Sequence, residues 1–401
     1  MRKPSILIIF LTVFVDLVGF GLIFPLLPIY SKNFGASGWV IGAIIAVYSL
    51  MQFIFAPIWG RLSDRIGRRP ILLISTACAS VAYSIFAIGS GMEGMVAVWI
   101  ILISRLFAGI CGANISVAQA YIADITPPEK RSARMGLIGM AFGLGFVFGP
   151  ALGSFSIVLF GLMGPGWVAA ALSAINFLWV MFMLPESWKP STEPVPQRPR
   201  LEQFTHTLSN PTMALLIGIF FLATFCFASF ETTIGLLVSQ NFSLNIEGEG
   251  AKTIGLLISY CAVLGALVQG GAIGKLVKKI GEPKLIASSM IIASVGMVLI
   301  PYLQTWALLL TGLGIFAIGS QLTRPPVFGM ISNLTSAAEQ GTTMGVAQSI
   351  GSLARILGPM FAAMTFETHP ALPYIICGVL SCLTGILAWR LLKRPPHHVQ
   401  G

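Results

Sequence analysis

The segment spanning residues 60–70 holds the densest group of ionisable side chains in the sequence. It places Asp64 among four arginines and two glycines, between two long apolar runs. Carboxylate and guanidinium groups form charge-assisted hydrogen bonds, which a moving protein can make in one state and break in another. We therefore interpret this segment as a conformational gate. Its expected members are Gly60, Leu62, Asp64, Arg65, Gly67, Arg68 and Arg69.

Asp64 has several candidate partners. They include the arginines of its own segment and, further along the chain, Arg131 and Arg134. Asp124 is a second acid within reach of the same arginines. Asp64 can also face the positive N-terminus of a helix beginning near residue 342. The alternative is a charged loop that only sets topology, but the ordered Gly and Asp positions favour a gate.

Two carboxylates, Asp16 and Glu231, lie inside apolar runs. A charged carboxylate deep in a bilayer is costly, so it must be paired, hydrated or protonated. Burial favours the neutral form, and reversible proton uptake is the chemistry that follows. For Asp16 a structural hydrogen bond to a neighbouring helix remains open. For Glu231 a shallow position near the outer surface remains open.

Arg105 is the third ionisable residue expected to take part in proton coupling. Small residues recur on its helix face, where they let a neighbouring helix approach; they are Gly109, Gly112, Ala113 and Ser116. The guanidinium can pair with a carboxylate and so set its protonation, or it can be a structural tie. Arg324 and Arg355 either line a cavity or extend toward the cytoplasmic face.

Neutral polar side chains inside apolar runs are candidates for substrate contact. Each is equally compatible with hydrogen bonding between helices. Phe227 joins them because it belongs to a phenylalanine-rich stretch that forms either a cavity wall or a lipid contact. The expected cavity residues are Tyr48, Gln52, Asn114, Phe227, Tyr260, Gln321 and Gln348.

The elements that position these residues are predicted to be transmembrane helices. The chain of 401 residues is 56% hydrophobic and 9% charged, whereas soluble domains carry about 25% charged residues. Apolar runs of about 20 residues predict an all-α membrane protein with twelve spans. They lie near 5–30, 38–59, 70–91, 96–123, 133–161, 166–185, 212–238, 253–274, 284–302, 306–332, 342–364 and 371–392.

Lysine and arginine predict the orientation. With both termini cytoplasmic, the outside loops hold only Lys32 and Lys252, while most other basic residues fall in cytoplasmic segments. The net charge of +10 therefore reflects membrane topology, because the basic residues form short clusters between apolar runs. We expect a multi-pass membrane protein that does not bind nucleic acid.

A polar, proline-rich stretch divides the spans six and six. We predict an N-terminal bundle at 1–190, a cytoplasmic linker at 191–210, a C-terminal bundle at 211–395 and a tail at 396–401. The halves share patterns: the motif beginning at Gly60 recurs from Gly274, and the Gly-Pro pair at 149–150 recurs at 358–359. Duplicated halves are typical of transporters with a site at the repeat interface.

These motifs resemble the major facilitator superfamily, and its twelve-span drug:proton antiporters that include the tetracycline exporters. The resemblance rests on residues 60–69, on Arg105 with Gly109 and Gly112, and on a first-span pattern from Asp16 to Pro28. It also rests on a fifth-span glycine pattern that is associated with antiport. That pattern comprises Gly143, Gly145, Gly149, Pro150 and Gly153. The resemblance implies two pseudo-symmetric six-helix bundles and a bacterial inner membrane. Gly149 and Pro150 either belong to the gate, by letting two helices slide or seal, or serve the ordinary close packing of membrane helices.

The second copy of the gate motif departs from the first. Residues 274–283 hold lysines, and Asp64 has no acidic counterpart. We therefore expect the gate chemistry of the two halves to be asymmetric.

The expected function is secondary active transport: proton-coupled export of small amphipathic compounds by alternating access. The expected partners are a small-molecule substrate, protons and membrane lipid, with the chain as a monomer and a proton gradient in place of a cofactor. The sequence has no Walker A loop and no catalytic triad pattern, and its six cysteines lack metal-ligand spacing. We thus expect neither an enzyme nor a metal site. Transport of a sugar, metabolite or lipid, or a receptor on the same fold, remains open.

Overall fold

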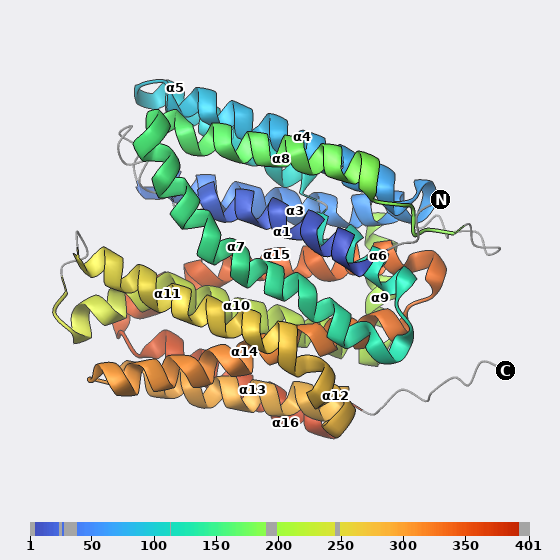
Figure 1. Ribbon diagram of the computed structural model, residues 1–401. Helices are drawn as coiled ribbons and strands as arrows, with labels where there is room; N and C mark the ends of the chain where they lie inside the picture. Colours follow the sequence, from blue (N-terminus) through green and yellow to red (C-terminus); the bar gives the residue numbers. More distant parts are fainter. Residues whose placement is uncertain are drawn as a thin grey trace. The chain divides into compact units, whose positions relative to one another are not determined.

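The computed structural model describes residues 5–23, 26–27, 38–112, 114–189, 199–244 and 249–392. Every regular element in these ranges is a helix (Figure 1). Eleven segments of the described chain are long and apolar enough to cross a membrane. The longest, Pro128–Met183, contains two such helices joined by a single turn, so twelve spans are consistent with the structure. The predicted all-α membrane fold is confirmed.

The described residues of the first half form seven longer helices. They are α1 (Ile6–Ile23), α3 (Gly38–Ile66), α4 (Arg68–Ser90), α5 (Gly94–Cys111), α6 (Asn114–Ile125), α7 (Arg131–Phe160) and α8 (Gly164–Met183). Together α5 and α6 form the predicted fourth span, which is interrupted after Cys111. The short helix η2 (Pro128–Lys130) precedes α7, and η3 (Gly161–Met163) joins α7 to α8.

The second half begins with the short α9 (Arg200–Ser209). It continues with α10 (Pro211–Asn241), α11 (Glu249–Leu267), α12 (Ile273–Ile280), α13 (Glu282–Leu299), α14 (Trp306–Leu334), α15 (Gln340–Thr368) and α16 (Leu372–Leu391). A π-helical turn, η4 (Val268–Ala272), links α11 to α12 within one span. The short helices η5 (Ile300–Tyr302) and η6 (Ala337–Glu339) precede α14 and α15, respectively.

Many large apolar side chains lie on the outer surfaces of these helices. Val158 is 83% exposed and Phe182 is 71% exposed. A soluble protein seldom exposes apolar side chains over such extended surfaces. The backbone polar groups of a helix are satisfied within the helix, so these surfaces are suited to lipid.

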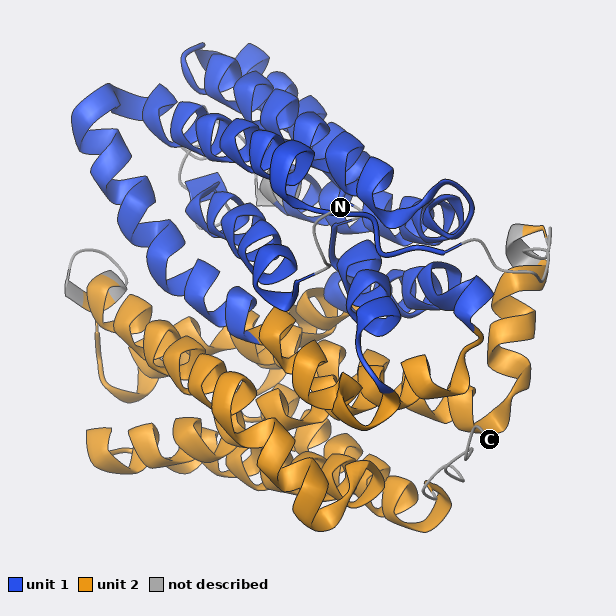
Figure 2. Cartoon of the chain, turned by 45° about the vertical axis from the view of Figure 1, so that its right-hand side comes forward, with its two compact units in different colours: residues 1–127, 140–198, 337–356 blue, residues 128–139, 199–336, 357–401 orange. Residues whose placement is uncertain are grey.

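The described chain divides into two compact units. Unit 1 comprises residues 1–127, 140–198 and 337–356, and unit 2 comprises residues 128–139, 199–336 and 357–401 (Figure 2). Two helices therefore each belong to both units: α7 starts in unit 2 and α15 starts in unit 1. The division by chain order into residues 1–190 and 211–395 stays a prediction.

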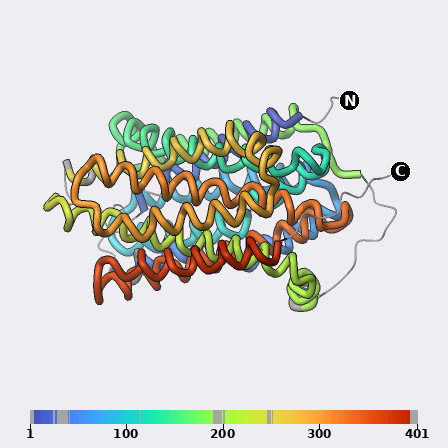
Figure 3. Tube along the Cα trace, turned by 90° about the horizontal axis from the view of Figure 1, so that it is seen from below, coloured from blue at the N-terminus to red at the C-terminus, as the bar shows by residue number. Residues whose placement is uncertain are grey.

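Each unit has its own apolar core. In unit 1, Leu22, Ile44, Phe86 and Ile101 are buried together, and α4 packs against α5 and α8. In unit 2, α13 packs against α14 and α16, and Figure 3 follows these helices from orange to red along the Cα trace. The phenylalanines of α10 contribute to this second core: the rings of Phe230 and Phe316 have centroids 4.4 Å apart.

The predicted boundaries of the second and third spans, at residues 59 and 70, need correction. The segment 60–70 is not a loop, because α3 continues to Ile66 and α4 begins at Arg68, with Gly67 alone between them. Polar side chains of this segment form hydrogen bonds with each other and with backbone N–H groups at a neighbouring helix start. The segment can therefore stay helical on both sides of Gly67. The predicted linker 191–210 contains the helix α9, because the prolines end at Pro199 and nothing beyond it interrupts a helix. Residues 190–198 lie outside the described chain.

Candidate gate and membrane-embedded polar sites

The helix break at Gly67 positions the charged residues of the gate segment. Gly67 has φ of 101°, a left-handed conformation that favours glycine. Because α4 starts immediately afterwards, Arg68 reaches back to α3, and its Nη1 lies 2.5 Å from the Asp64 carboxylate. Both side chains are fully buried. Asp64 and Arg68 therefore form an ion pair between the end of one helix and the start of the next.

Asp64 also binds the N-terminus of α15. Its Oδ1 accepts the Gly341 backbone N–H at 2.8 Å, and its Oδ2 accepts the Thr342 N–H and hydroxyl, each at 2.6 Å. Helix N-termini have unsatisfied N–H groups and carry partial positive charge, so they bind carboxylates well. All of these residues belong to unit 1. Gly60 and Gly341 approach so closely that a Cβ on either would overlap the other's carbonyl.

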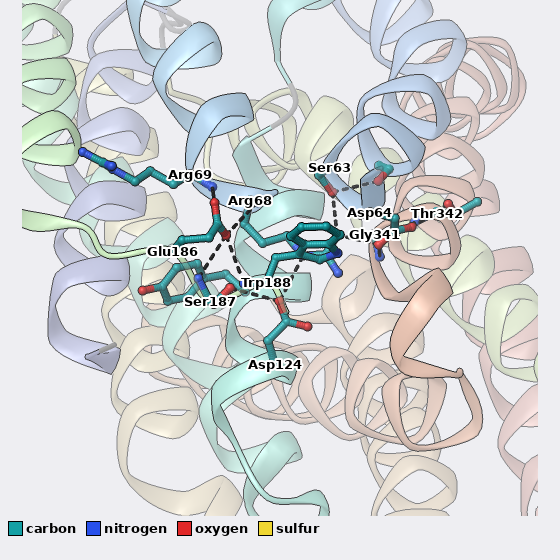
Figure 4. A network of polar contacts seen from close by, with 12 residues as sticks. Ser63, Asp64, Arg68, Arg69, Asp124, Glu186, Ser187, Trp188, Gly341 and Thr342 are labelled. Carbon is teal, nitrogen blue, oxygen red and sulfur yellow. Dashed lines mark hydrogen bonds and ion pairs between the residues drawn. The ribbon is translucent and has the colours of Figure 1, made fainter. Parts of the chain in front are cut away.

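A second group of acids completes this network (Figure 4). Asp124, at the end of α6, accepts a hydrogen bond from Arg68 Nε at 3.0 Å and another from the Ser187 hydroxyl at 3.0 Å. Glu186 accepts the backbone N–H groups of Arg68 at 2.9 Å and Arg69 at 3.1 Å. Glu186 thus caps α4, and Arg68 is shared between Asp64 and Asp124.

Gly67→Ala tests how tightly this network constrains the helix break. An added Cβ would meet the Glu186 carboxylate at 2.5 Å and force a side chain into a left-handed conformation. We expect a loss of about 1–2 kcal/mol from the backbone alone, together with displacement of Glu186. Thermal unfolding of the purified protein measures the loss. Gly42→Ala is the control, because beyond its own stretch of helix no atom lies within 4 Å of a Cβ at that glycine. Equal melting temperatures for the two variants would contradict the prediction.

Asp16 is half-buried on α1 within unit 1. The side chain of the buried Asn114, at the start of α6, hydrogen-bonds to its carboxylate. The break between α5 and α6 places Asn114 at a helix start, so its side chain can point toward α1. A carboxylate held by a neutral amide inside a helical unit can exist in either protonation state.

Tyr48 and Gln52 form a second polar group on one face of α3. Gln52 Nε2 donates to the Tyr48 hydroxyl at 3.0 Å and to the Gly112 carbonyl at 3.3 Å. Arg355, in the α15 segment of unit 1, donates to Gln52 Oε1 at 3.0 Å. The missing side chains at Gly109 and Gly112 let α5 approach α3, since a Cβ at Gly109 would lie 2.6 Å from the Tyr48 carbonyl.

Arg105 is buried between aromatic rings. Its guanidinium carbon lies 5.6 Å from the ring centroids of both Tyr83 and Phe86, which is a cation–π arrangement. Its Nε has no hydrogen-bond partner among the described residues. Tyr48 lies close enough to Asp16, Arg105 and Arg355 to interact with the charges of all three. The structure thus gathers one acid and two arginines around Tyr48.

The remaining cavity candidates fall into two groups. In unit 1, Gln348 Nε2 donates to Gln119 Oε1 at 3.2 Å. In unit 2, Gln321 accepts a hydrogen bond from Gln269 of the π-helical turn. Both pairs connect neighbouring helices, so they also hold the helices together.

The other unit 2 candidates lie on α10, α11 and α14. The Tyr260 hydroxyl donates to the Leu310 carbonyl at 3.3 Å. Arg324 lies over the Phe227 ring at 5.3 Å. Glu231 is half-buried on α10, one helical turn beyond Phe227. Asp16 belongs to unit 1 and Glu231 to unit 2.

Gly149 and Pro150 lie inside α7 where it packs on α1 within unit 1. A Cβ at Gly149 would overlap the backbone of Gly21, and one at Gly21 would lie 2.6 Å from the Gly145 carbonyl. The glycine pattern of α7 therefore permits direct backbone contact between the two helices.

The structure separates some residues that we grouped in the gate. Arg131 donates to the Ser332 carbonyl at 3.0 Å and to Asn333 at 3.3 Å, all within unit 2. Arg65 and Arg134 are exposed, and Leu62 is partly buried. Sequence reasoning missed Glu186 and Thr342. The signal for Glu186 was an acid directly after the sixth span, and the signal for Thr342 was a hydroxyl in the first turn of the eleventh.

Comparisons with known proteins identify the family to which this chain belongs. The sequence model of the Major Facilitator Superfamily matches residues 9–359 and, in a second match, residues 250–401. The chain belongs to the Major Facilitator Superfamily. It is 32% identical to the class E tetracycline resistance protein of Escherichia coli over 94% of this chain and 92% of the relative. Multidrug resistance protein 2 of Bacillus subtilis is 29% identical, over 94% of this chain and 92% of that protein.

The fold of this superfamily member is also found in solved structures. The human organic anion transporter MFSD10 (TETRAN) matches with a TM-score of 0.83 and 24% identity, covering 96% of this chain and 100% of that structure. Because the chain belongs to the Major Facilitator Superfamily, the protein is an integral membrane transporter and not an enzyme. Among the described residues, no group of three His, Cys, Asp or Glu side chains could hold a metal ion.

Proposed function

We propose that this superfamily member exports small amphipathic organic compounds in exchange for protons. The observation that carries the proposal is Asp16, a half-buried acid within unit 1 whose carboxylate is bound by Asn114 and lies near Tyr48. The relatives named for tetracycline and multidrug resistance support export of organic compounds as the direction and substrate class. The proposed location is a bacterial inner membrane with both termini cytoplasmic.

Proton exchange follows from the energetics of an embedded acid. Closing a site around a charged carboxylate is unfavourable, whereas closing it around the neutral acid is not. A bound substrate can stabilise the charged form instead, so proton and substrate compete for the same state. Arg105 and Arg355 lie close enough to Tyr48 to interact with it, so positive charge is present near this acid in unit 1. Glu231 is the corresponding candidate in unit 2.

Alternating access requires contacts that hold one state and break in another. The Asp64 contacts with Gly341 and Thr342 have this character, because they join the end of α3 to the start of a helix that continues into unit 2. Release of that helix start would expose a buried ion pair to water. We therefore assign Asp64, Arg68 and the helix break at Gly67, with Asp124 and Glu186, to a gate that opens once in each cycle.

Transport in proteoliposomes tests the proposal. The purified full-length chain is reconstituted with an acidic interior, and uptake of tetracycline and of ethidium is followed separately. We expect accumulation of at least one probe that disappears when the pH gradient is collapsed. A flux of equal size without the gradient would indicate facilitated diffusion and contradict antiport. Specific binding of a compound that is never transported would favour the receptor alternative.

A further inference from the structure

The start of α7 is held in unit 2 by an acid–hydroxyl contact. Ser132, which is fully buried, donates its hydroxyl proton to Glu282 Oε1 at 2.5 Å. Glu282 is the first residue of α13 and is partly buried. Both residues belong to unit 2, although α7 continues into unit 1 beyond residue 139. This contact lies outside the gate segment described above.

Further contacts position Ser132 for this bond. Gly329 of α14 makes room for it, because a Cβ there would overlap the Ser132 hydroxyl. Arg131 donates to the Ser332 carbonyl, where the C-terminal end of α14 carries partial negative charge. Gly136 faces the Gln269 carbonyl in the π-helical turn, where a Cβ would lie only 2.6 Å from the oxygen. The start of α7 is thus fitted to unit 2 along two helical turns.

The two gate motifs correspond, but their charges are exchanged. Counting from Gly60 and Gly274, Lys278 stands where Asp64 stands, and Glu282 stands where Arg68 stands. In the first copy the acid lies on the helix before the glycine break and binds the start of α15. In the second copy the acid lies on the helix after the break, which Gly281 forms with φ of 80°, and it binds the start of α7. The second motif therefore has an acid at a shifted position.

The hydroxyl partner is also at a different position, one residue earlier on its helix. Gly136 and Gly345 correspond in the two halves, so Ser132 stands where Gly341 stands, and Ala133 stands where Thr342 stands. Thr342 supplies the hydroxyl to Asp64, whereas Ala133 has none. An acid at position 278 would have no side-chain hydroxyl opposite it. The acid and the hydroxyl therefore both occupy different sequence positions in the second copy, and an acid–hydroxyl contact is present in each unit.

We propose that Glu282 is a positioning residue of the transport cycle and that Glu282 with Ser132 forms a second latch, equivalent to Asp64 with Thr342. The second latch holds residues 131–139 in unit 2 during the same state in which the first holds residues 340–348 in unit 1. The proposal rests on alternating access as the mode of transport. It is tested without a substrate, so failure of proton coupling would not affect its outcome.

Hydrogen–deuterium exchange of the full-length protein in lipid nanodiscs measures each latch separately. Amide exchange reports local opening of the structure. Glu282→Ala and Ser132→Ala should therefore each accelerate exchange in residues 135–139. The expected acceleration is about tenfold, which corresponds to the free energy lost with one charge-assisted hydrogen bond. Residues 344–348 should keep their rate. Exchange in the double variant should be no faster than in the faster of the two single variants, because the two substitutions remove the same contact. Glu282→Asp should restore part of the protection.

Lys284→Ala is the matched control, since Lys284 is exposed and lies in the same helical turn as Glu282. Asp64→Asn is the reciprocal control and should accelerate exchange in residues 344–348 but not in residues 135–139. Equal exchange in wild type, Ser132→Ala and Glu282→Ala would overturn the proposal. So would additive effects in the double variant, or acceleration that spreads equally over both segments. If Glu282→Ala fails to fold, Ser132→Ala and Glu282→Asp provide the same comparison.

Discussion

Asp64→Asn is expected to reduce transport at least about tenfold. Breaking a buried ion pair typically costs about 3–5 kcal/mol of stability, so the state that this pair holds would be less populated during the cycle. The fully buried carboxylate accepts hydrogen bonds from Arg68, from two backbone N–H groups and from the Thr342 hydroxyl. Asparagine keeps a single acceptor oxygen and directs an NH2 group at other donors. Arg68 retains only Asp124 as an ionic partner in the described network.

Initial rates of probe uptake in proteoliposomes check this prediction. Arg65→Gln is the control, because Arg65 follows Asp64 on α3 but is exposed. We expect Arg65→Gln to transport at nearly the wild-type rate. Wild-type transport by Asp64→Asn would show that the contact with the start of α15 does not limit the cycle.

Asp16→Asn is expected to abolish accumulation driven by the pH gradient while leaving downhill flux. A pH difference of one unit stores about 1.36 kcal/mol per proton, which supports roughly tenfold accumulation of a neutral substrate in a one-for-one exchange. Asparagine cannot exchange a proton, yet it preserves the size of the side chain and a hydrogen bond to Asn114. The ratio of inside to outside probe at steady state measures the loss.

Glu231→Gln tests the second candidate carrier in the same assay. Glu367→Gln is the control for both variants, because Glu367 is an exposed acid near the end of α15. Loss of accumulation in Asp16→Asn alone would assign the coupling proton to unit 1. Full gradient-driven accumulation by both Asp16→Asn and Glu231→Gln would exclude these two residues as carriers.

The spans could be predicted from the sequence because their cause is local. A run of about 20 apolar residues must satisfy its backbone hydrogen bonds internally in lipid, so it forms a helix wherever it lies. The segment 60–70 was identified as unusual for an equally local reason, since its charges interrupt two such runs. Its structure was not predicted, because the single Gly67 break depends on Glu186, which lies more than 100 residues away and supplies the cap for α4.

What the sequence by itself determined is that this chain crosses the membrane repeatedly, carries Asp16, Glu231 and Arg105 inside its spans, and repeats a glycine-flanked motif at residues 60 and 274. Only the tertiary structure decided the partners of these groups. Asp64 binds a helix start 277 positions away, and Ser132 binds Glu282 at a separation of 150. The physical reason is that small residues allow membrane helices many possible neighbours, so a helix end meets a particular acid only after the whole unit has packed.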